Sequence, residues 1–381
     1  MHYFLIAGEA SGDLHAADLI EALKLIDKDS FFTFLGGDRM ALAAAKEPVV
    51  HYNQMAFMGF SEVLRNIGKI GQNMKKAKLT VKLAQPDALI LIDYPSFNLK
   101  VGEYASKMGI PVYYYISPKI WAWKKWRINT IKKVVRRVFS ILPFEPEFYR
   151  QNGGEAIYVG NPSVSEMKKR IEAAPGRKDF LAKYRLRDRA LVALMPGSRL
   201  GEIRNNLPVM IAAMDTFPQY RPFIIGAPGV ADAFYATFVG RKEIPLIRPE
   251  HATEALAHCA GALVTSGTAT LETAIAKVPQ VVLYRANGSK VAYEIMSRIL
   301  DVKFVSLPNL ICNKAVVPEM LLHDCTPERV ADVFAPLLRK NSPEQLMQTE
   351  GYGQMLDILG DSDAAMEAAK EIYSDLALIK K

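Results

Sequence analysis

Four segments of the chain place small, hydroxylated or charged side chains directly after an apolar run. In an open parallel sheet, ligands bind beyond the carboxyl ends of the strands, so residues in this position are the first candidates for chemistry. The four segments are "GEASGDLH" at 8–15, "DYPSFN" at 93–98, "PGSRLGEIRNN" at 196–206 and "TSGTATLE" at 265–272.

Two of these segments hold a candidate base. Asp93 follows the apolar run 88–92 and Pro95 ends the strand, which leaves a carboxylate at a rigid edge where it can take a proton from a hydroxyl. The alternative is a turn aspartate that accepts hydrogen bonds from backbone amides. His15, one helical turn into the first segment, is the second candidate base, although a histidine there is more often a structural donor. Asp13 can cap the helix.

The other two segments predict an anion-binding site. Backbone amides, the Ser198 hydroxyl and the Arg199 guanidinium at a helix start can converge on one phosphate. A cation such as Arg199 is disfavoured at a helix N-terminus unless an anion binds there. The later segment offers Ser266, Gly267 and Thr268 for a diphosphate, and Glu272 for a ribose diol. A helix-capping motif alone would also explain Ser or Thr followed by Glu.

No cofactor or metal is expected. The first segment is neither G-x-G-x-x-G nor a Walker loop. The D-x-D pairs at 27–29 and 361–363 fall before a predicted strand and between predicted helices, and we interpret both as solvated loops. The three cysteines are widely spaced and lack a C-x-x-C pair, so the sequence indicates neither a zinc site nor a disulfide framework.

Short apolar runs alternate with longer amphipathic segments along nearly the whole chain, which predicts parallel sheets covered by helices. The strand candidates are "YFLIAG", "FFTFLG", "ALILID", "PVYYYIS", "VFSIL", "AIYVG", "LVALMPG", "PFIIGAP", "IPLIRP", "GALVTSG" and "QVVLYR". We expect an α/β fold of two Rossmann-like domains facing across a cleft. The predicted parts are 1–161, a hinge region at 162–189, a second domain at 190–340, and C-terminal helices at 341–381. Those helices are expected to pack back across the first domain or onto a second chain, as in a homodimer.

The chain has 381 residues and a formal net charge of +8. Residues 1–160 hold 21 basic against 15 acidic side chains, so most of the excess charge lies in the first part. This asymmetry suggests an anionic partner there. The opening apolar run is too short for a signal peptide, and no stretch reaches the roughly 20 apolar residues of a spanning helix. We expect a cytoplasmic protein, peripheral to a membrane.

Residues 116–137 hold all three tryptophans, Trp121, Trp123 and Trp126, together with eight lysines and arginines. This density suits nucleic acid, a membrane surface, a phosphorylated ligand or a solvated helix face. Isoleucines and valines at 128, 131, 135 and 138 have helical spacing and are expected to face a core. The outer face, including Arg136 and Arg137, is then free for phosphates.

The motifs together resemble those of the lipid-A-disaccharide synthases, over residues 1–338. They are "GEASGD", "MGFSEVL", "IDYPSFN", "ISPKIWAWKKWR", "LPFEPEFY", "LMPGSRLGEI", "SGTATLE" and "FVSLPNLI", in this order. The family is similar to the two-domain GT-B glycosyltransferases. The resemblance implies an inverting, metal-independent transfer of 2,3-diacylglucosamine from its UDP donor to the 6-hydroxyl of 2,3-diacylglucosamine 1-phosphate (lipid X), which gives the β(1→6) disaccharide and UDP.

The resemblance also implies roles for particular residues. Asp93 is the base, with His15 as second choice, and Ser198, Arg199, Ser266, Gly267, Thr268 and Glu272 hold the UDP part of the donor. Family members commonly read "DAPDFN", and this chain has Ser96 in place of the second acid. Because both substrates are acylated, the enzyme is expected on the inner face of the inner membrane, at an anionic surface. The acceptor and lipid residues are then Ser11, Met58, Phe60, Glu62, Trp121, Trp123, Lys124 and Arg127.

Two other functions fit parts of the sequence. Aromatic and basic residues together can also bind RNA, but no nucleic-acid module is recognised and we expect no nucleic-acid partner. A second UDP-sugar enzyme of the same architecture, such as an epimerase or a peptidoglycan glycosyltransferase, is the nearer alternative. Only the motifs in the N-terminal part of the chain argue against it.

Overall fold

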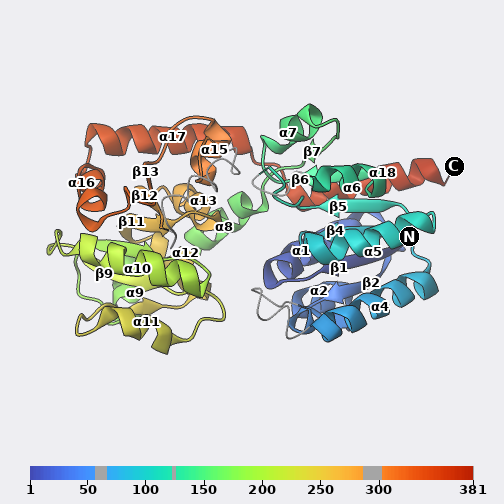
Figure 1. The fold of residues 1–381 in the computed structure, drawn as a ribbon, viewed down its shortest axis with the longest axis horizontal. Helices are drawn as coiled ribbons and strands as arrows, with labels where there is room; N and C mark the ends of the chain where they lie inside the picture. The colour runs from blue at the N-terminus through green and yellow to red at the C-terminus, as the bar shows by residue number, and fades with distance from the viewer. Residues whose placement is uncertain (56–66, 122–125, 286–302, 381) are drawn as a thin grey trace. The chain divides into compact units, whose positions relative to one another are not determined.

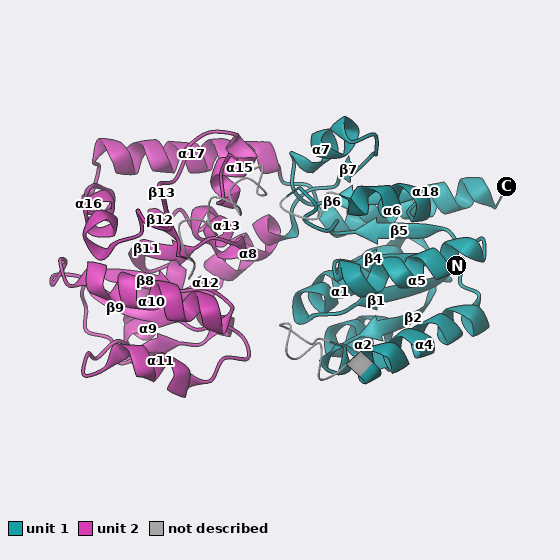
Figure 2. Ribbon diagram, viewed as in Figure 1, with its two compact units in different colours: residues 1–162, 361–381 teal, residues 163–360 magenta. Residues whose placement is uncertain are grey.

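The computed structural model describes residues 1–55, 67–121, 126–285 and 303–380 (Figure 1). The chain divides into two compact units (Figure 2). Unit 1 comprises residues 1–162 and 361–381, and unit 2 comprises residues 163–360.

Unit 1 is built on a seven-stranded parallel sheet with the order β3-β2-β1-β4-β5-β6-β7. Its strands are β1 (His2–Ala7), β2 (Phe31–Gly36), β3 (Val50–His51), β4 (Ala88–Ile92), β5 (Val112–Tyr115), β6 (Arg137–Ser140) and β7 (Ile157–Tyr158). Its helices are α1 (Ala10–Ile26), α2 (Asp38–Ala44), α4 (Ile67–Ala84), α5 (Pro95–Lys107), α6 (Arg127–Val134), α7 (Glu145–Gln151) and α18 (Ala364–Ile379), with the 3-10 turn η1 (Tyr52–Gln54).

Unit 2 has a six-stranded parallel sheet with the order β10-β9-β8-β11-β12-β13, which is the Rossmann order. Its strands are β8 (Leu191–Met195), β9 (Arg221–Ile225), β10 (Leu246–Ile247), β11 (Cys259–Thr265), β12 (Gln280–Tyr284) and β13 (Glu319–Leu321). Its helices are α8 (Pro162–Glu172), α9 (Arg177–Lys183), α10 (Leu200–Met214), α11 (Asp232–Val239), α12 (Ala252–Leu256), α13 (Thr268–Ile275), α15 (Leu307–Cys312), α16 (Pro327–Leu337) and α17 (Pro343–Leu359), with the 3-10 turn η2 (Pro249–His251). The expected pair of parallel-sheet α/β domains is confirmed.

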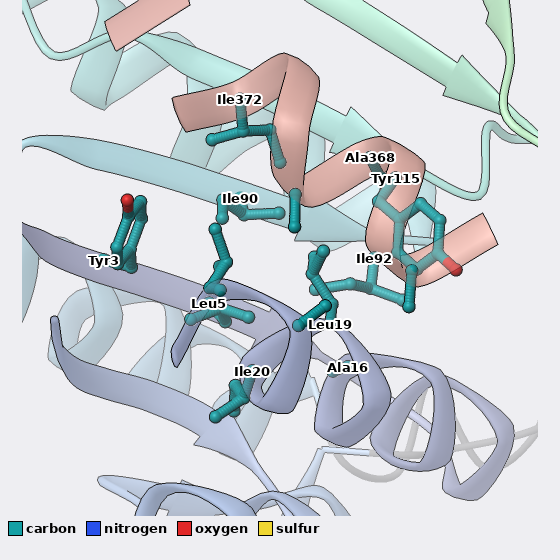
Figure 3. Packing of buried hydrophobic residues seen from close by; sticks show 14 of the residues in the cluster. Tyr3, Leu5, Ala16, Leu19, Ile20, Ile90, Ile92, Tyr115, Ala368 and Ile372 are labelled. Carbon is teal, nitrogen blue, oxygen red and sulfur yellow. The ribbon is translucent and has the colours of Figure 1, made fainter. Parts of the chain in front are cut away.

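Alternating side chains of the central strands bury both faces of the sheet in unit 1. Tyr3 and Leu5 of β1 belong to one core cluster, which includes residues of α1 and α18 (Figure 3). Phe4 and Ile6 belong to a second cluster, which includes residues of α4, α5 and α6. All four side chains are fully buried, as strands covered by helices on both faces require.

The borders of the units differ in detail from the predicted parts. The predicted hinge region at 162–189 forms helices α8 and α9, and all of it except Pro162 belongs to unit 2. The predicted C-terminal helices are divided between the two units, because α17 belongs to unit 2 and α18 packs against α1 in unit 1. The chain therefore passes between the units twice, next to Pro162 and next to Gly360.

The two D-x-D pairs are structural and are not simply solvated loops. Asp363 caps α18 by accepting hydrogen bonds from the amides of Ala365 and Met366 at 3.1 and 3.0 Å. Asp27 is only 8% exposed and accepts a hydrogen bond from the N-terminal ammonium group at 2.8 Å. Both aspartates are thus used in holding the ends of elements.

A buried aspartate anchors the C-terminal helix to the sheet of unit 1. Asp375 of α18 is 2% exposed and accepts hydrogen bonds from the Tyr113 hydroxyl at 2.6 Å and from Nε of Arg136 at 2.5 Å. Arg137 adds ion pairs with Asp375 at 3.0 Å and with Glu371 at 2.8 Å. These two arginines therefore hold α18 in place, which is a role that the sequence analysis did not give them.

We predict that Asp375→Ala lowers the free energy of unfolding by about 3 kcal/mol, because it leaves Arg136 and the buried Tyr113 hydroxyl without their acceptor and removes one of the two acidic partners of Arg137. Burial alone would raise the pKa of Asp375, but the hydrogen bonds from Arg136 and Tyr113 outweigh burial and hold that pKa below its ordinary value. The stabilisation is therefore present at neutral pH and is lost as the pH falls through that pKa. Denaturant unfolding measures the loss. The control Glu371→Ala removes one partly exposed ion pair and should cost at most about 1 kcal/mol; equal losses would contradict the anchoring role.

Candidate active site

The ends of β1 and β4 meet at a turn in which only glycine fits. A Cβ atom on Gly8 would lie 2.3 Å from the ring of Tyr94, so the first loop passes directly against that side chain. Asp93 and Tyr94 both have left-handed backbone conformations, with φ of 41° and 46°. Two successive non-glycine residues in this region store strain that the surroundings must compensate. These left-handed conformations turn the chain sharply at the point where Asp93 leaves the sheet.

Two buried side chains hold the backbone of Asp93 in this conformation. The carboxamide of Asn98 donates hydrogen bonds to the carbonyl oxygens of Ile92 at 3.0 Å and Asp93 at 2.8 Å. The hydroxyl of Tyr114 in β5 donates to the Asp93 carbonyl at 2.6 Å. The backbone of Asp93 is thus held by side chains from α5 and β5.

Opposing influences act on the pKa of the Asp93 carboxyl. Burial raises the pKa of this half-buried carboxyl, whereas the charge of Lys119 and a hydrogen bond from the Tyr94 amide lower it. The net pKa lies above its ordinary value. A carboxylate with a raised pKa accepts a proton more readily than an exposed one, which suits a general base.

His15 is poorly suited to carry a positive charge. Its ring lies in α1, and its buried Nδ1 has no hydrogen-bond partner among the described residues. Burial lowers its pKa to about 4. The neighbouring Ser11 is exposed in the first turn of α1. Asp13 does not cap α1. Its buried carboxylate instead accepts hydrogen bonds from the amides of Gly37 and Met40 at the start of α2, at 2.6 and 3.3 Å.

A buried carboxyl that the sequence analysis missed lies at the carboxyl edge of the same sheet. Glu145, the first residue of α7, is 1% exposed, and its Oε1 accepts hydrogen bonds from the Trp121 indole at 3.1 Å and the Ser117 hydroxyl at 3.4 Å. The Trp121 ring also packs edge-on against Phe144. The predicted lipid residue Trp121 is therefore partly buried and fixed, whereas Trp126 is 64% exposed. Only the motif "LPFEPEFY" indicated Glu145 in the sequence.

Arg127 is joined to the segment that carries Asp93. It is 8% exposed, and its Nη2 donates to the Ser96 hydroxyl at 2.8 Å. The residue that replaces the family's second acid thus contacts a buried guanidinium. Ile128 and Ile131 on the same helix are buried, as expected. The predicted residues Met58, Phe60, Glu62, Trp123 and Lys124 lie outside the described residues.

In unit 2, an internal carboxylate already occupies the start of α10. Oε2 of Glu202 accepts hydrogen bonds from the amides of Ser198 and Arg199 at 2.9 and 3.3 Å, and its Oε1 pairs with the Arg199 guanidinium at 3.1 Å. Arg199 therefore does not require a bound anion, contrary to the expectation from the sequence, because Glu202 supplies the negative charge from within the helix. The Arg199 side chain is 77% exposed and accessible from solvent.

The end of β11 presents an exposed turn. Gly267 has φ of 150° and precedes α13, whose start has no side-chain cap. Gly267 and Thr268 are exposed, so amides in the first turn of this helix are accessible to an anion. The Ser266 hydroxyl donates to the Val305 carbonyl at 2.7 Å, so this hydroxyl holds the neighbouring loop and is not a free donor.

Glu272 lies one turn into α13 and faces residues of α8. Burial and the nearby Glu166 raise its pKa, and Arg170 opposes them. Arg170 also pairs with Glu166. The raised pKa means that the charged form of the half-buried Glu272 carboxyl is disfavoured, and a neutral group such as a sugar hydroxyl is a suitable hydrogen-bonding partner for it.

Glu319 organises the loop that follows, where the motif "FVSLPNLI" begins α15. Its carboxylate accepts hydrogen bonds from the Ser306 hydroxyl at 2.6 Å, the Ser306 amide at 2.9 Å and the Asn309 carboxamide at 2.8 Å. Ser306 and Asn309 are both buried. This network was not predicted, since Glu319 stands eight residues beyond the end of the motif.

Among the described residues, no helix is long and apolar enough to cross a membrane. No group of three or more histidine, cysteine, aspartate and glutamate side chains in that part of the chain could hold a metal ion.

Two Rossmann-ordered units with polar residues at the strand ends define the architecture of the GT-B glycosyltransferases and related UDP-sugar enzymes. The crystal structure of a UDP-GlcNAc 2-epimerase from Neisseria meningitidis superposes with a TM-score of 0.68 at 13% identity, with all of both chains covered. MurG from Acinetobacter baumannii gives 0.55 at 15% identity, covering 98% of this chain and 99% of that one. At such identities these similarities show the fold alone.

The sequence comparisons are more specific. Residues 3–370 match the family model of lipid-A-disaccharide synthetase. A lipid-A-disaccharide synthase from Myxococcus xanthus is 38% identical over 374 residues, covering 97% of this chain and 96% of the relative. One from Syntrophus aciditrophicus is 36% identical and covers 99% and 97%. The chain belongs to the lipid-A-disaccharide synthase family and is a glycosyltransferase of lipid A biosynthesis, which confirms the prediction from the motifs.

We predict that Glu145→Gln stabilises the protein at neutral pH. Burial raises the pKa of Glu145 to about 8 from an ordinary 4.5, so between these values the folded protein retains a proton that the unfolded chain releases, and stability falls as the pH rises. Glutamine removes this cost and keeps an acceptor for Trp121. The gain should be about 3 kcal/mol at pH 7 and should vanish near pH 4.5. Denaturant unfolding across this range tests it. The exposed Glu147→Gln is the control, and a gain that does not depend on pH would contradict the buried neutral carboxyl.

Proposed function

We propose that this enzyme transfers 2,3-diacylglucosamine from UDP-2,3-diacylglucosamine to the 6-hydroxyl of 2,3-diacylglucosamine 1-phosphate, giving the β(1→6) disaccharide 1-phosphate and UDP. Asp93 is the base, and the transfer inverts the anomeric centre without a metal ion. The observation that carries the proposal is the half-buried carboxyl of Asp93, held on a strained strand end in a chain of this family.

In unit 1, the acceptor hydroxyl oxygen attacks the anomeric carbon of the donor, and the Asp93 carboxylate takes the proton of that hydroxyl. The bond from that carbon to the UDP oxygen breaks on the opposite face, which gives inversion. His15 is a weaker second choice, because burial lowers its pKa to about 4 and so reduces its proton affinity at neutral pH. Ser11 and Arg127 lie on the helices next to the Asp93 strand end and are proposed to contact the acceptor.

In unit 2, the exposed groups at the starts of α10 and α13 are proposed to hold the UDP part of the donor. Arg199 and the exposed Ser198 hydroxyl meet the diphosphate, because the Ser198 amide already donates to Glu202. The uncapped turn at Gly267 and Thr268 adds amide donors. Glu272 accepts from the ribose hydroxyls. Ser266 contributes by fixing the turn, because its hydroxyl is bonded to Val305. UDP-GlcNAc is bound in the structure of the similar epimerase, which supports a UDP-sugar ligand.

The acylated substrates require access to a lipid surface, and we propose that unit 1 works at the anionic inner face of the inner membrane. Helix α4 carries several lysines and two exposed leucines, Leu79 at 55% and Leu83 at 76% exposed. Together with the exposed Trp126, these side chains suit a headgroup region. A homodimer through the C-terminal helices stays a prediction, which light scattering of the purified chain would test.

The test of function is mass spectrometry of the products formed from the two lipid substrates with EDTA present. We predict that Asp93→Asn lowers turnover at least a thousandfold, on the order of what loss of a general base costs, while UDP affinity stays within about twofold. The β(1→6) disaccharide should be the product of the unchanged protein. A variant that retained more than about a tenth of the activity would show that Asp93 is not the base.

We predict that Arg199→Ala weakens UDP binding by about tenfold to a hundredfold, as expected for loss of a charge-assisted contact to the diphosphate. Isothermal titration with UDP measures the effect. Arg204→Ala, which removes an exposed arginine from the same helix, is the matched control and should leave the affinity nearly unchanged. Equal affinities for both variants would assign Arg199 to the helix cap with Glu202 alone.

A further inference from the structure

The segment that follows β5 brings one exposed lysine to the strand end that carries Asp93. Strands β4 and β5 pair with Ile92 opposite Tyr115, so the next residues, Asp93 and Ile116, leave the sheet side by side. Ile116 also has a left-handed backbone, with φ of 61°, so the chain turns after β5 as it does after β4. In the turn that follows, Lys119 is exposed between the buried Pro118 and Ile120.

Both sides of this turn are fixed by hydrogen bonds. Ahead of it, the Tyr114 hydroxyl is bonded to the Asp93 carbonyl at 2.6 Å. Within it, the Ser117 hydroxyl is bonded to Glu145 at 3.4 Å, and beyond it Trp121 is bonded to the same carboxyl at 3.1 Å. The backbone that carries Lys119 is thus held between the predicted base and a buried acid.

Lys119 lies in the turn that follows the strand end next to Asp93, between two residues that are bonded to Glu145. Its charge lowers the pKa of Asp93 and that of Glu145. Burial has the opposite effect on both and is stronger at Glu145, whose pKa is raised to about 8, so Glu145 is mostly neutral at pH 7. Because Glu145 is mostly neutral, the carboxylate that the charge of Lys119 stabilises is that of Asp93. Among the described residues, the other ionisable groups around this strand end include Tyr94, Tyr114, Arg127 and Glu9. The charge of Arg127 acts on Tyr114, and that of Glu9 acts on Tyr94.

We propose that Lys119 is a positioning residue for the transfer, whose positive charge keeps the Asp93 carboxylate ionised and ready to accept the proton of the acceptor hydroxyl. The inference rests on the proposed role of Asp93. The reason is physical: a half-buried carboxyl without a nearby cation retains its proton to higher pH, and a protonated carboxyl cannot act as a base. After the transfer, the same charge favours release of the captured proton to solvent.

The experiment is the pH profile of kcat/KM for the full chain and for Lys119→Met and Lys119→Arg. Activity falls on the acid side as Asp93 becomes protonated. In Lys119→Met, the acid-side fall in activity should move to higher pH, and at pH values above that fall the activity should approach that of the unchanged protein. In Lys119→Arg, the fall should return to its original pH. The acceptor phosphate titrates equally in every assay, so differences between variants arise in the protein. Glu145→Gln is the matched control and should leave the acid-side fall in place, because Glu145 is already neutral there.

Two outcomes would overturn the inference, and both differ from a failure of the proposed function. If Lys119→Met lowered activity by one factor at every pH, Lys119 would contact substrate or support the fold without acting on the base. If Lys119→Arg moved the fall as far as Lys119→Met does, the charge would not be the cause. A fully active Asp93→Asn would instead remove the base assignment itself, whatever the lysine variants do.

Discussion

The carboxamide of Asn98 holds the strand ends on which the candidate site of unit 1 is built. It donates to the carbonyl oxygens of Ile6, Ile92 and Asp93, at 3.3, 3.0 and 2.8 Å, and so joins the ends of β1 and β4. Without such donors, the left-handed turn at Asp93 would leave buried carbonyls unpaired, which is costly in a dry interior. The strain at the turn is thus compensated by bonds from the helix that follows it.

Unit 2 uses an asparagine in the same way. Asn206, fully buried in α10, donates to the Thr265 hydroxyl at 3.0 Å and accepts from the Arg285 amide at 3.0 Å, which joins the ends of β11 and β12. Both carboxamides lie on the first helix after a strand, where they reach the loops of neighbouring strands. In each unit, a buried carboxamide thus pairs with backbone groups at the strand ends that carry the adjoining turns.

The hydrogen-bond partners and nearby charges of the carboxyl groups in unit 1 give these groups different roles. Asp375 is as buried as Glu145, but two arginines and a tyrosine compensate its charge, so it stays ionised and anchors a helix. Glu145 has only an indole and a hydroxyl as donors and remains largely neutral. Asp93 lies between these cases, half-buried and next to one lysine. The number and charge of the partners, more than depth alone, decide which acid can accept a proton.

The sequence by itself determined the family, the two parallel-sheet domains and eleven of the strands, because long runs of Val, Ile, Leu and Tyr allow few other structures. It missed β3 and β13, two short strands in which a polar residue, His51 or Glu319, interrupts the apolar pattern. Only the tertiary structure decided what the charged residues contact. Arg136 and Arg137 pair with residues more than 200 positions away. Glu202, by contrast, bonds to Ser198 at the start of its own helix, which is a local contact that the sequence analysis overlooked. Local patterns follow from backbone geometry and burial, whereas the partner of a charge depends on which distant segments the fold brings together.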